Sequence, residues 1–512
     1  MAVRILIWGQ RGIKMTKRVL RTRSLAIAIT VSALCLSGTV LAEVPAKPNV
    51  LPVPPTGKAP LSSADREGTE YIDLAKAGYL EEEYYLFGSA PAITAKGETV
   101  ADAPYITRIL VRKPKDPARF NGTVIIEPFT WFGERGAGWI LTRDYLVHQG
   151  YAYVGYTLNI NKPENDPKFL PTDLPKDIKR YAGIVNFEFM RDFDYARYAP
   201  LGFYFDPERF KRGDVVDPFV PQSQGVGAQL AMLLKSNDAD GPLAGLHVDR
   251  VYVNSWAVTA QVWMDYLDQG RHQQWRMPDG SALIDAYMTG RMSYGEVGGE
   301  VIRVPRHMPD DAPFVTIFTQ SELRYNAVNS IPLPPDTDRP PLRYYEVPGT
   351  PHLRPEDVGT GEIEPMPADV GKENDPRCNT LYDEPLEVVA SALLNGMDKW
   401  VRNGTPMPRS PRVRRKGNDI ARDAATGNAI GGVRLPWIEA PAAIYMVEEE
   451  TNCGLAYDTK MPYSAERLRK MYGSYANYRK KYEAAKADAI EQGYLLPKDA
   501  AQLDPIAEPE DF

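Results

Sequence analysis

The chain has 512 residues, of which 43% are hydrophobic and 25% are charged, a composition typical of a soluble globular protein. Its length suits one large domain with insertions, or two domains. Seven of the 60 basic residues and none of the 67 acidic residues precede residue 43, so the chain from residue 43 on has a net charge of −14. This excess of negative charge argues against nucleic acid or an anionic membrane surface as a partner.

The first 42 residues have the pattern of an export signal. Basic residues between positions 17 and 23 precede the apolar run Leu25–Leu36, which is too short to span a bilayer readily. Val40-Leu41-Ala42 ends the run with small residues at the first and third places before a cut. We predict a true start at Met15, cleavage after residue 42 and a periplasmic or secreted protein. An uncleaved membrane anchor is the alternative. No later run reaches the length of a membrane span, so no membrane contact is expected after cleavage.

Two cysteines, Cys378 and Cys453, follow the predicted signal segment. In an exported chain such a pair can form a disulfide, so a bridge and two free thiols are both open alternatives. The two cysteines are far apart in the sequence, and the five histidines are scattered. Because no metal-ligand spacing is present, we expect no metal ion and no other cofactor.

Apolar runs separated by turn residues predict alternating strands and helices from about residue 101. The runs 106–111 and 123–126, joined through Asn121-Gly122, are expected to form adjacent strands. Further strands are expected over 151–158, 251–253, 282–292, 314–319 and 342–347, and helices over 139–149, 222–236, 259–267, 385–403 and 466–492. This order is typical of an α/β protein with a mainly parallel sheet and helices on both faces.

The same patterns divide the chain beyond the signal segment into three parts. Residues 43–100 are expected to form an extended, proline-rich arm and the start of the domain. Residues 101–405 are expected to form the α/β core, with an insertion near 160–220 that is rich in proline, aspartate, arginine and aromatic residues. Residues 406–512 are expected to form a C-terminal extension packed on the core.

The run from Arg250 to Gln261 has the most informative local pattern. An expected strand, a turn of small residues and an expected helix follow one another, which is the setting of a nucleophile elbow. In an active elbow Gly-x-Ser-x-Gly places a serine at the apex of the turn. Here the five positions hold Ser255-Trp256-Ala257-Val258-Thr259, so the apex residue is Ala257. A methyl group cannot attack a carbonyl carbon.

Two downstream residues occupy the other positions that such a site needs. Glu322 follows the expected strand 314–319, and His352 follows the expected strand 342–347. An α/β-hydrolase presents nucleophile, acid and base in this chain order, and the acid orients the histidine and stabilises its cation. A plain loop carboxylate and a surface histidine are the alternative interpretations.

The oxyanion hole of such a site needs two backbone N–H donors. One belongs to the residue after the apex, which is Val258 here. The other comes from an earlier loop, for which the segment after strand 123–126 is the candidate. Phe129 is assigned to this position, because Pro128 has no backbone N–H.

Several segments between residues 100 and 505 resemble those of bacterial exported α/β-hydrolase domain proteins of uncharacterised function. The family's strand and loop GTVVVEWLN is similar to Gly122–Pro128, and its TETD and EVAGTAH loops are similar to Thr319–Glu322 and Glu346–His352. The most specific similarities lie in Trp400–Thr405 and Gly427–Pro436. The resemblance implies an α/β-hydrolase fold, an acid at position 322 and a histidine at position 352.

The departures from this family lie in the elbow. The family's GWSQT or GESQS aligns without a gap with residues 255–259, so its serine is replaced by Ala257. The glycine two residues earlier is Ser255 here, and the glutamine after the apex is Val258. The resemblance therefore implies an esterase-like architecture whose nucleophile is substituted.

Three functions are compatible with these residues. The first is a pseudoenzyme that binds a small-molecule ester or acyl ligand and has lost or weakened hydrolysis. The second is an active carboxylic-ester or acyl hydrolase. It would use Ser255, about 6–7 Å along an extended chain from the apex, or a water activated by His352 and Glu322. The third is a non-hydrolytic enzyme in which the histidine–acid pair is a general base.

Overall fold

The computed structural model describes residues 43–65, 71–94, 96–129, 134–158, 186–205, 219–291, 296–297, 300–301, 305–328, 337–352, 384–417, 419–446 and 459–509. The predicted signal segment, most of the predicted insertion, and both Cys378 and Cys453 lie outside these residues. Export, the insertion and the disulfide therefore stay predictions. No helix within the described residues is both long enough and apolar enough to cross a bilayer.

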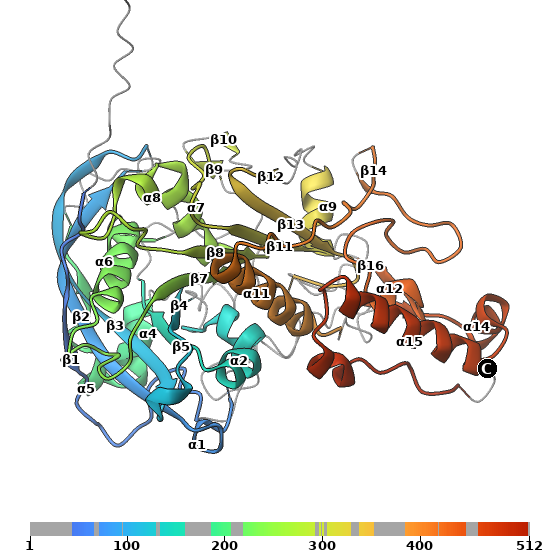
Figure 1. Cartoon of the computed structure of the whole chain (residues 1–512), viewed down its shortest axis with the longest axis horizontal. Helices are drawn as coiled ribbons and strands as arrows, with labels where there is room; N and C mark the ends of the chain where they lie inside the picture. The colour runs from blue at the N-terminus through green and yellow to red at the C-terminus, as the bar shows by residue number, and fades with distance from the viewer. Residues whose placement is uncertain are drawn as a thin grey trace, which may run out of the picture. The chain divides into compact units, whose positions relative to one another are not determined.

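An 11-stranded sheet runs through the protein in the order β1-β2-β3-β5-β4-β7-β8-β11-β13-β12, with β6 paired to β3 (Figure 1). Its strands are β1 Asn49–Pro52, β2 Tyr79–Ile93, β3 Thr99–Pro114, β4 Thr123–Pro128, β5 Ala152–Tyr156, β6 Gly202–Phe203, β7 Arg250–Trp256, β8 Ala286–Gly290, β11 Phe314–Thr319, β12 Thr337–Asp338 and β13 Pro341–Val347. The six strands β5, β4, β7, β8, β11 and β13 lie side by side, and each adjacent pair is parallel. This confirms the expected mainly parallel sheet.

Helices cover both faces of the parallel strands. On one face α6 (Ser223–Lys235) and α7 (Ala260–Asp268) share a core with Val251 and Val253 of β7. On the other face α2 (Ala137–Gln149) and α11 (Leu386–Asn403) share a core with Tyr252. Successive side chains of a strand point to opposite faces, so the apolar run 251–253 supplies both cores.

The described residues also form smaller elements. The two-stranded pairs are β9 Glu296–Val297 with β10 Glu300–Val301, β14 Arg415–Lys416 with β15 Asp419–Ile420, and β16 Ala443–Met446 with β17 Thr459–Pro462. The other helices are α1 Leu74–Ala77, α4 Asn186–Phe193, α5 Tyr195–Tyr198, α8 Arg271–Gln274, α9 Gln320–Val328, α12 Pro436–Glu439, α14 Ala465–Tyr472 and α15 Tyr475–Glu491. The 3-10 helices in the part of the chain that the structure describes are η1 Pro117–Arg119, η4 Ala257–Thr259 and η6 Pro497–Gln502.

Two expectations about these elements are wrong. Strands β3 and β4 are not adjacent, because β5 lies between them, parallel to β4 and antiparallel to β3. The crossover through α2 brings β5 into that position. The expected helix 466–492 is two helices, α14 and α15. Gly473 interrupts it with a φ of 77°, and Ser474 caps α15 by accepting a hydrogen bond from the N–H of Asn477.

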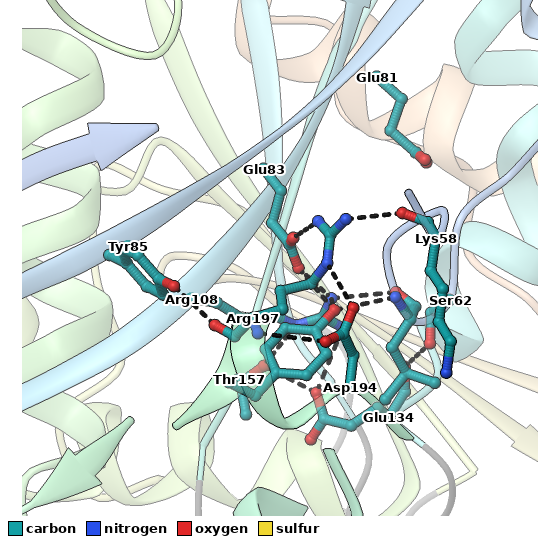
Figure 2. A network of polar contacts seen from close by, with 12 residues as sticks. Lys58, Ser62, Glu81, Glu83, Tyr85, Arg108, Glu134, Thr157, Asp194 and Arg197 are labelled. Atoms are coloured by element: carbon teal, nitrogen blue, oxygen red, sulfur yellow. Dashed lines mark hydrogen bonds and ion pairs between the residues drawn. The ribbon is translucent and has the colours of Figure 1, made fainter. Parts of the chain in front are cut away.

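A buried network of charges joins the N-terminal arm to the sheet (Figure 2). Glu83 of β2 lies 2.7 Å from Arg108 of β3 and 2.5 Å from Arg197 of α5. Arg108 also lies 3.6 Å from Glu134 and donates to the carbonyl of Leu61 in the arm (3.0 Å). Burial alone would lower the pKa of Arg108, but Tyr198, Glu83 and Glu134 raise it above its ordinary value. The network therefore keeps its buried charges paired.

Gly290, the last residue of β8, lies against the indole ring of Trp256. A Cβ atom at this position would lie 2.2 Å from the ring, and the ring is held by a hydrogen bond from its N–H to Asn254 (2.7 Å). We expect Gly290→Ala to lower the free energy of unfolding by about 1–3 kcal/mol, because neither the strand backbone at position 290 nor the indole ring of Trp256 can move freely. Gly88→Ala is the matched control, since its nearest neighbour would be at 3.7 Å. Equal urea midpoints for the two variants would contradict this expectation.

Candidate functional site

The chain makes a sharp turn where β7 ends. Trp256 is the last residue of the strand, and Ala257 begins η4 with a φ of 52°. A residue with a Cβ atom rarely adopts positive φ, and such strain persists where the surrounding structure enforces it. Helix α7 then starts at Ala260. The strand, turn and helix expected for this segment are present, with Ala257 at the bend.

The two nearest hydroxyl groups of this segment are engaged with each other. Ser255 is 0% exposed, and its Oγ donates to Oγ1 of Thr259 at 3.0 Å. The hydroxyl of Thr259 in turn donates to the carbonyl of Trp256 at 2.7 Å. Ser255 therefore lies inside the strand, and its hydroxyl would have to leave this arrangement to meet a ligand.

Glu322 and His352 are in direct contact. Nδ1 of His352 lies 2.5 Å from Oε1 of Glu322, and the two side chains are 31% and 3% exposed. The other carboxylate oxygen accepts hydrogen bonds from the backbone N–H and the hydroxyl of Thr319 (2.7 and 2.5 Å). Burial alone would raise the pKa of Glu322, but His352 and Thr319 hold it below its ordinary value. An ionised Glu322 fixes the Nδ1–H tautomer of the imidazole, which leaves Nε2 to act as a base.

The parallel sheet brings the three positions to one edge. Trp256 pairs with Gly290 of β8, and Gly290 pairs with Ile317 of β11, while Thr319 pairs with Val347 of β13. Because the carboxyl ends of parallel strands lie at the same edge, the residues that follow β7, β11 and β13 all emerge there (Figure 1). Strand β8 lies between β7 and β11, the strand that precedes Glu322, and β13, the strand that precedes His352, lies next to β11.

The two residues assigned to the oxyanion hole differ in availability. Val258 is 37% exposed, and its N–H lies in the first turn of η4, where a helix has no internal acceptors. Phe129 is fully buried, and its N–H donates to the carbonyl of Tyr156 at 2.8 Å. This bond to the sheet argues against Phe129 as an oxyanion donor, and both assignments stay predictions.

Three neighbours of the acid were not recognised in the sequence. The hydroxyl of Thr319 donates a hydrogen bond to Glu322, and the hydroxyl of Ser321 accepts one from the backbone N–H of His352 (2.8 Å). The side chain of Gln320 accepts a hydrogen bond from Gly349, in the loop that carries His352. The available signals were their position at the end of a predicted strand, directly before a predicted acid, and the resemblance of Thr319–Glu322 to the TETD loop. Polar residues of this kind are common at strand ends, so sequence alone gives them no specific function.

Helix α7, which follows the turn, contains a carboxyl group with a strongly shifted pKa. Burial first, and then the charge of Asp268, raise the pKa of Asp265 to about 8, although a hydrogen bond from Gln261 acts in the opposite direction. The folded state therefore favours the protonated form. The stability that the protonated Asp265 contributes is fully present below the pKa of an aspartate in the unfolded chain, about 4. It is lost as the pH rises toward 8.

We expect Asp265→Asn to remove this loss, because an amide resembles a neutral carboxyl group in shape. The variant should be as stable as the parent near pH 4 and more stable at pH 8, by roughly 1–3 kcal/mol. Urea unfolding at both pH values measures the difference. Asp268→Asn should instead destabilise, since Asp268 is paired with Arg306 (2.6 Å). An unchanged pH dependence in Asp265→Asn would contradict the assignment of a neutral carboxyl.

No group of three or more histidine, cysteine, aspartate or glutamate side chains within the described residues is arranged to hold a metal ion.

The strand order and the crossovers are those of the α/β-hydrolase fold. A model of the family described as "Alpha/beta hydrolase domain" matches residues 47–505, so the chain belongs to this family. No curated protein matches the chain. The chain therefore has the α/β-hydrolase fold.

Several solved structures are similar to the chain at low sequence identity. Esterase Est22 is 13% identical, covering 58% of this chain and 78% of its own, with a TM-score of 0.30. A serine hydrolase without a lid from Xanthomonas campestris is 11% identical, covering 51% and 84%, with a TM-score of 0.23. A cold-adapted esterase from an Arctic intertidal metagenomic library is 9% identical, covering 47% and 73%, with a TM-score of 0.24. The family assignment rests on the family model.

Proposed function

We propose that this protein binds a small-molecule ester or acyl ligand at the edge formed by Ala257, Glu322 and His352, and that it has lost serine-nucleophile hydrolysis. One observation carries the proposal: an alanine with a φ of 52° occupies the bend between β7 and η4. Covalent hydrolysis of an ester needs a nucleophile at this bend, and a methyl group has no lone pair to offer.

Two further observations support the two parts of this proposal, the retained site and the lost nucleophile. The contact between Glu322 and His352 is short and well supported, although Ala257 at the bend offers it no nucleophile to activate. The buried hydrogen bond of Ser255 argues against a replacement nucleophile two residues away. A hydrolase site without its serine can keep ligand binding and a rate enhancement of roughly 10³–10⁴ over water.

Stopped-flow mixing with p-nitrophenyl butyrate tests the proposal. We expect no burst of p-nitrophenol, because no acyl-enzyme forms. We also expect saturable binding of ethyl butyrate by calorimetry. A burst equal to the protein concentration would overturn the loss of the nucleophile. A lack of binding at millimolar ester would overturn the ligand class.

A second candidate is general-base chemistry by His352, on a bound water or on a substrate proton. It is favoured by the ionised, buried Glu322, which leaves Nε2 of a partly exposed imidazole as the base. Any turnover of this kind should show no covalent adduct and should disappear in His352→Ala. Turnover that persists in His352→Ala would rule this chemistry out.

We also propose that the protein is exported and that residues 1–42 are removed. The support is the basic region, apolar run and small residues described above. N-terminal sequencing of the periplasmic or secreted protein should begin at Glu43. A protein that keeps its first residues would contradict this proposal.

A further inference from the structure

The loop that carries His352, residues 347–352, is held by the side chain of a buried glutamine. The backbone N–H of Gly349 donates to Oε1 of Gln320 at 3.0 Å, and the backbone N–H of Gln320 donates to the carbonyl of Thr350 at 2.9 Å. Nε2 of Gln320 donates to the carbonyl of Tyr445, in β16, at 3.0 Å. The amide group of Gln320 thus hydrogen-bonds the histidine loop through its oxygen. Through its nitrogen it hydrogen-bonds the C-terminal extension, residues 406–512, which is called the C-terminal segment below.

The same loop is held a second time by the C-terminal segment. The indole N–H of Trp437 donates to the carbonyl of Pro348 at 3.1 Å. The indole ring also lies so close to Gly349 that a Cβ atom there would be 2.8 Å away. The φ of Gly349 is 73°, a conformation that a residue with a side chain rarely adopts. The backbone N–H of Val433 donates to the carbonyl of Glu346 at 2.7 Å.

These contacts determine where the imidazole lies. Glu322 fixes Nδ1 of His352, and Ser321 accepts from its backbone N–H. Gln320 and Trp437 fix the backbone that precedes it. The direction of Nε2 therefore depends on all of these contacts. A displacement of about 1 Å matters, because it can reduce a catalytic rate roughly 10²-fold.

We propose that Gln320 is a positioning residue of the candidate site, and that residues 433–446 of the C-terminal segment are part of that site. Any effect of this positioning on catalysis or ligand binding rests on the proposed function. The positioning itself concerns only His352 and its loop, and it is independent of the residue at position 257.

Two variants of the full-length protein isolate this role. Gln320→Met keeps the length of the side chain and removes its hydrogen bonds to Gly349 and to Tyr445. Trp437→Phe keeps an aromatic ring against Gly349 and removes only the N–H. Gln229→Met is the matched control, because Gln229 is also buried and also bridges two partners, the hydroxyl of Tyr105 (2.8 Å) and the carbonyl of Ser89 (2.7 Å).

The first readout is the low-field proton resonance of Nδ1–H in His352, identified by its loss in His352→Ala and Glu322→Gln. We expect it to shift or broaden in Gln320→Met and Trp437→Phe, and to stay unchanged in Gln229→Met. A general loss of stability would not distinguish the three variants in this way. The second readout is hydrogen exchange of the peptide 345–352. It should be about five- to tenfold faster in the first two variants only, as one lost hydrogen bond predicts.

Folded Gln320→Met and Trp437→Phe proteins with unchanged resonance and unchanged exchange would overturn the proposal. If only Gln320→Met fails to fold, Trp437→Phe still decides the role of the C-terminal segment. If the parent shows no resonance assignable to His352, the acid–histidine pair of the proposed function fails, and the exchange of the loop still decides the role of Gln320.

Discussion

Ala257→Ser is expected to hydrolyse short-chain p-nitrophenyl esters at least about 10³ times faster than the parent protein. Loss of a triad serine lowers turnover by on the order of 10⁶, and the other parts of the site retain roughly 10³–10⁴ over water. Restoring the hydroxyl should therefore recover a large share of the difference, because Glu322 and His352 are already in contact. Initial rates with p-nitrophenyl butyrate measure the effect.

Ala257→Gly is the control for this experiment. Glycine relieves the strain of a φ of 52° but supplies no nucleophile, so it should gain no hydrolysis. The double variant Ala257→Ser with His352→Ala should lose most of the gain, because the serine then has no base. If Ala257→Ser gains nothing, the acid–histidine pair or the oxyanion site is not arranged for hydrolysis.

Arg108→Met is expected to lower the free energy of unfolding by about 3–5 kcal/mol, the effect of removing one partner from a buried ion pair. Arg108 is fully buried, and its replacement leaves Glu83 and Glu134 without this cation (Figure 2). The loss should exceed that of Lys47→Ala, whose pair with Asp238 is largely exposed and contributes about 0–1 kcal/mol. Urea unfolding at neutral pH compares the two.

A double-mutant cycle with Glu83→Gln separates this pairing from general packing. If the two residues stabilise each other, the double variant should lose clearly less than the sum of the single losses. Additive losses would show that Arg108 acts through its other contacts, among them the carbonyl of Leu61.

The sequence predicted the parallel strands because they are buried on both faces. The expected strand over 314–319 and β11 coincide, and the expected helix over 385–403 is α11, which ends at Gly404 with a φ of 67°. Strand β2 was not predicted, since three consecutive glutamates at 81–83 are typical of an exposed segment. Glu81 and Glu83 are instead paired with Arg112 and Arg108 of β3, which lie 31 and 25 residues further along the chain. Pairing at that distance cannot be recognised from local patterns.

The candidate site could be predicted only in part. Chain order alone put Glu322 and His352 at the ends of neighbouring strands, and the structure has them in contact. Two hydrogen bonds depend on backbone geometry that the sequence does not show. The N–H of Phe129 donates to the carbonyl of Tyr156, and the hydroxyl of Ser255 donates to that of Thr259. Gln320 was missed because its partner Tyr445 is 125 residues away.

The most direct test of a site without its nucleophile is mass spectrometry of the intact protein after treatment with a fluorophosphonate. The parent should stay unlabelled, and Ala257→Ser should gain one adduct that maps to position 257. Stoichiometric labelling of the parent, at Ser255 or at any other residue, would contradict the account.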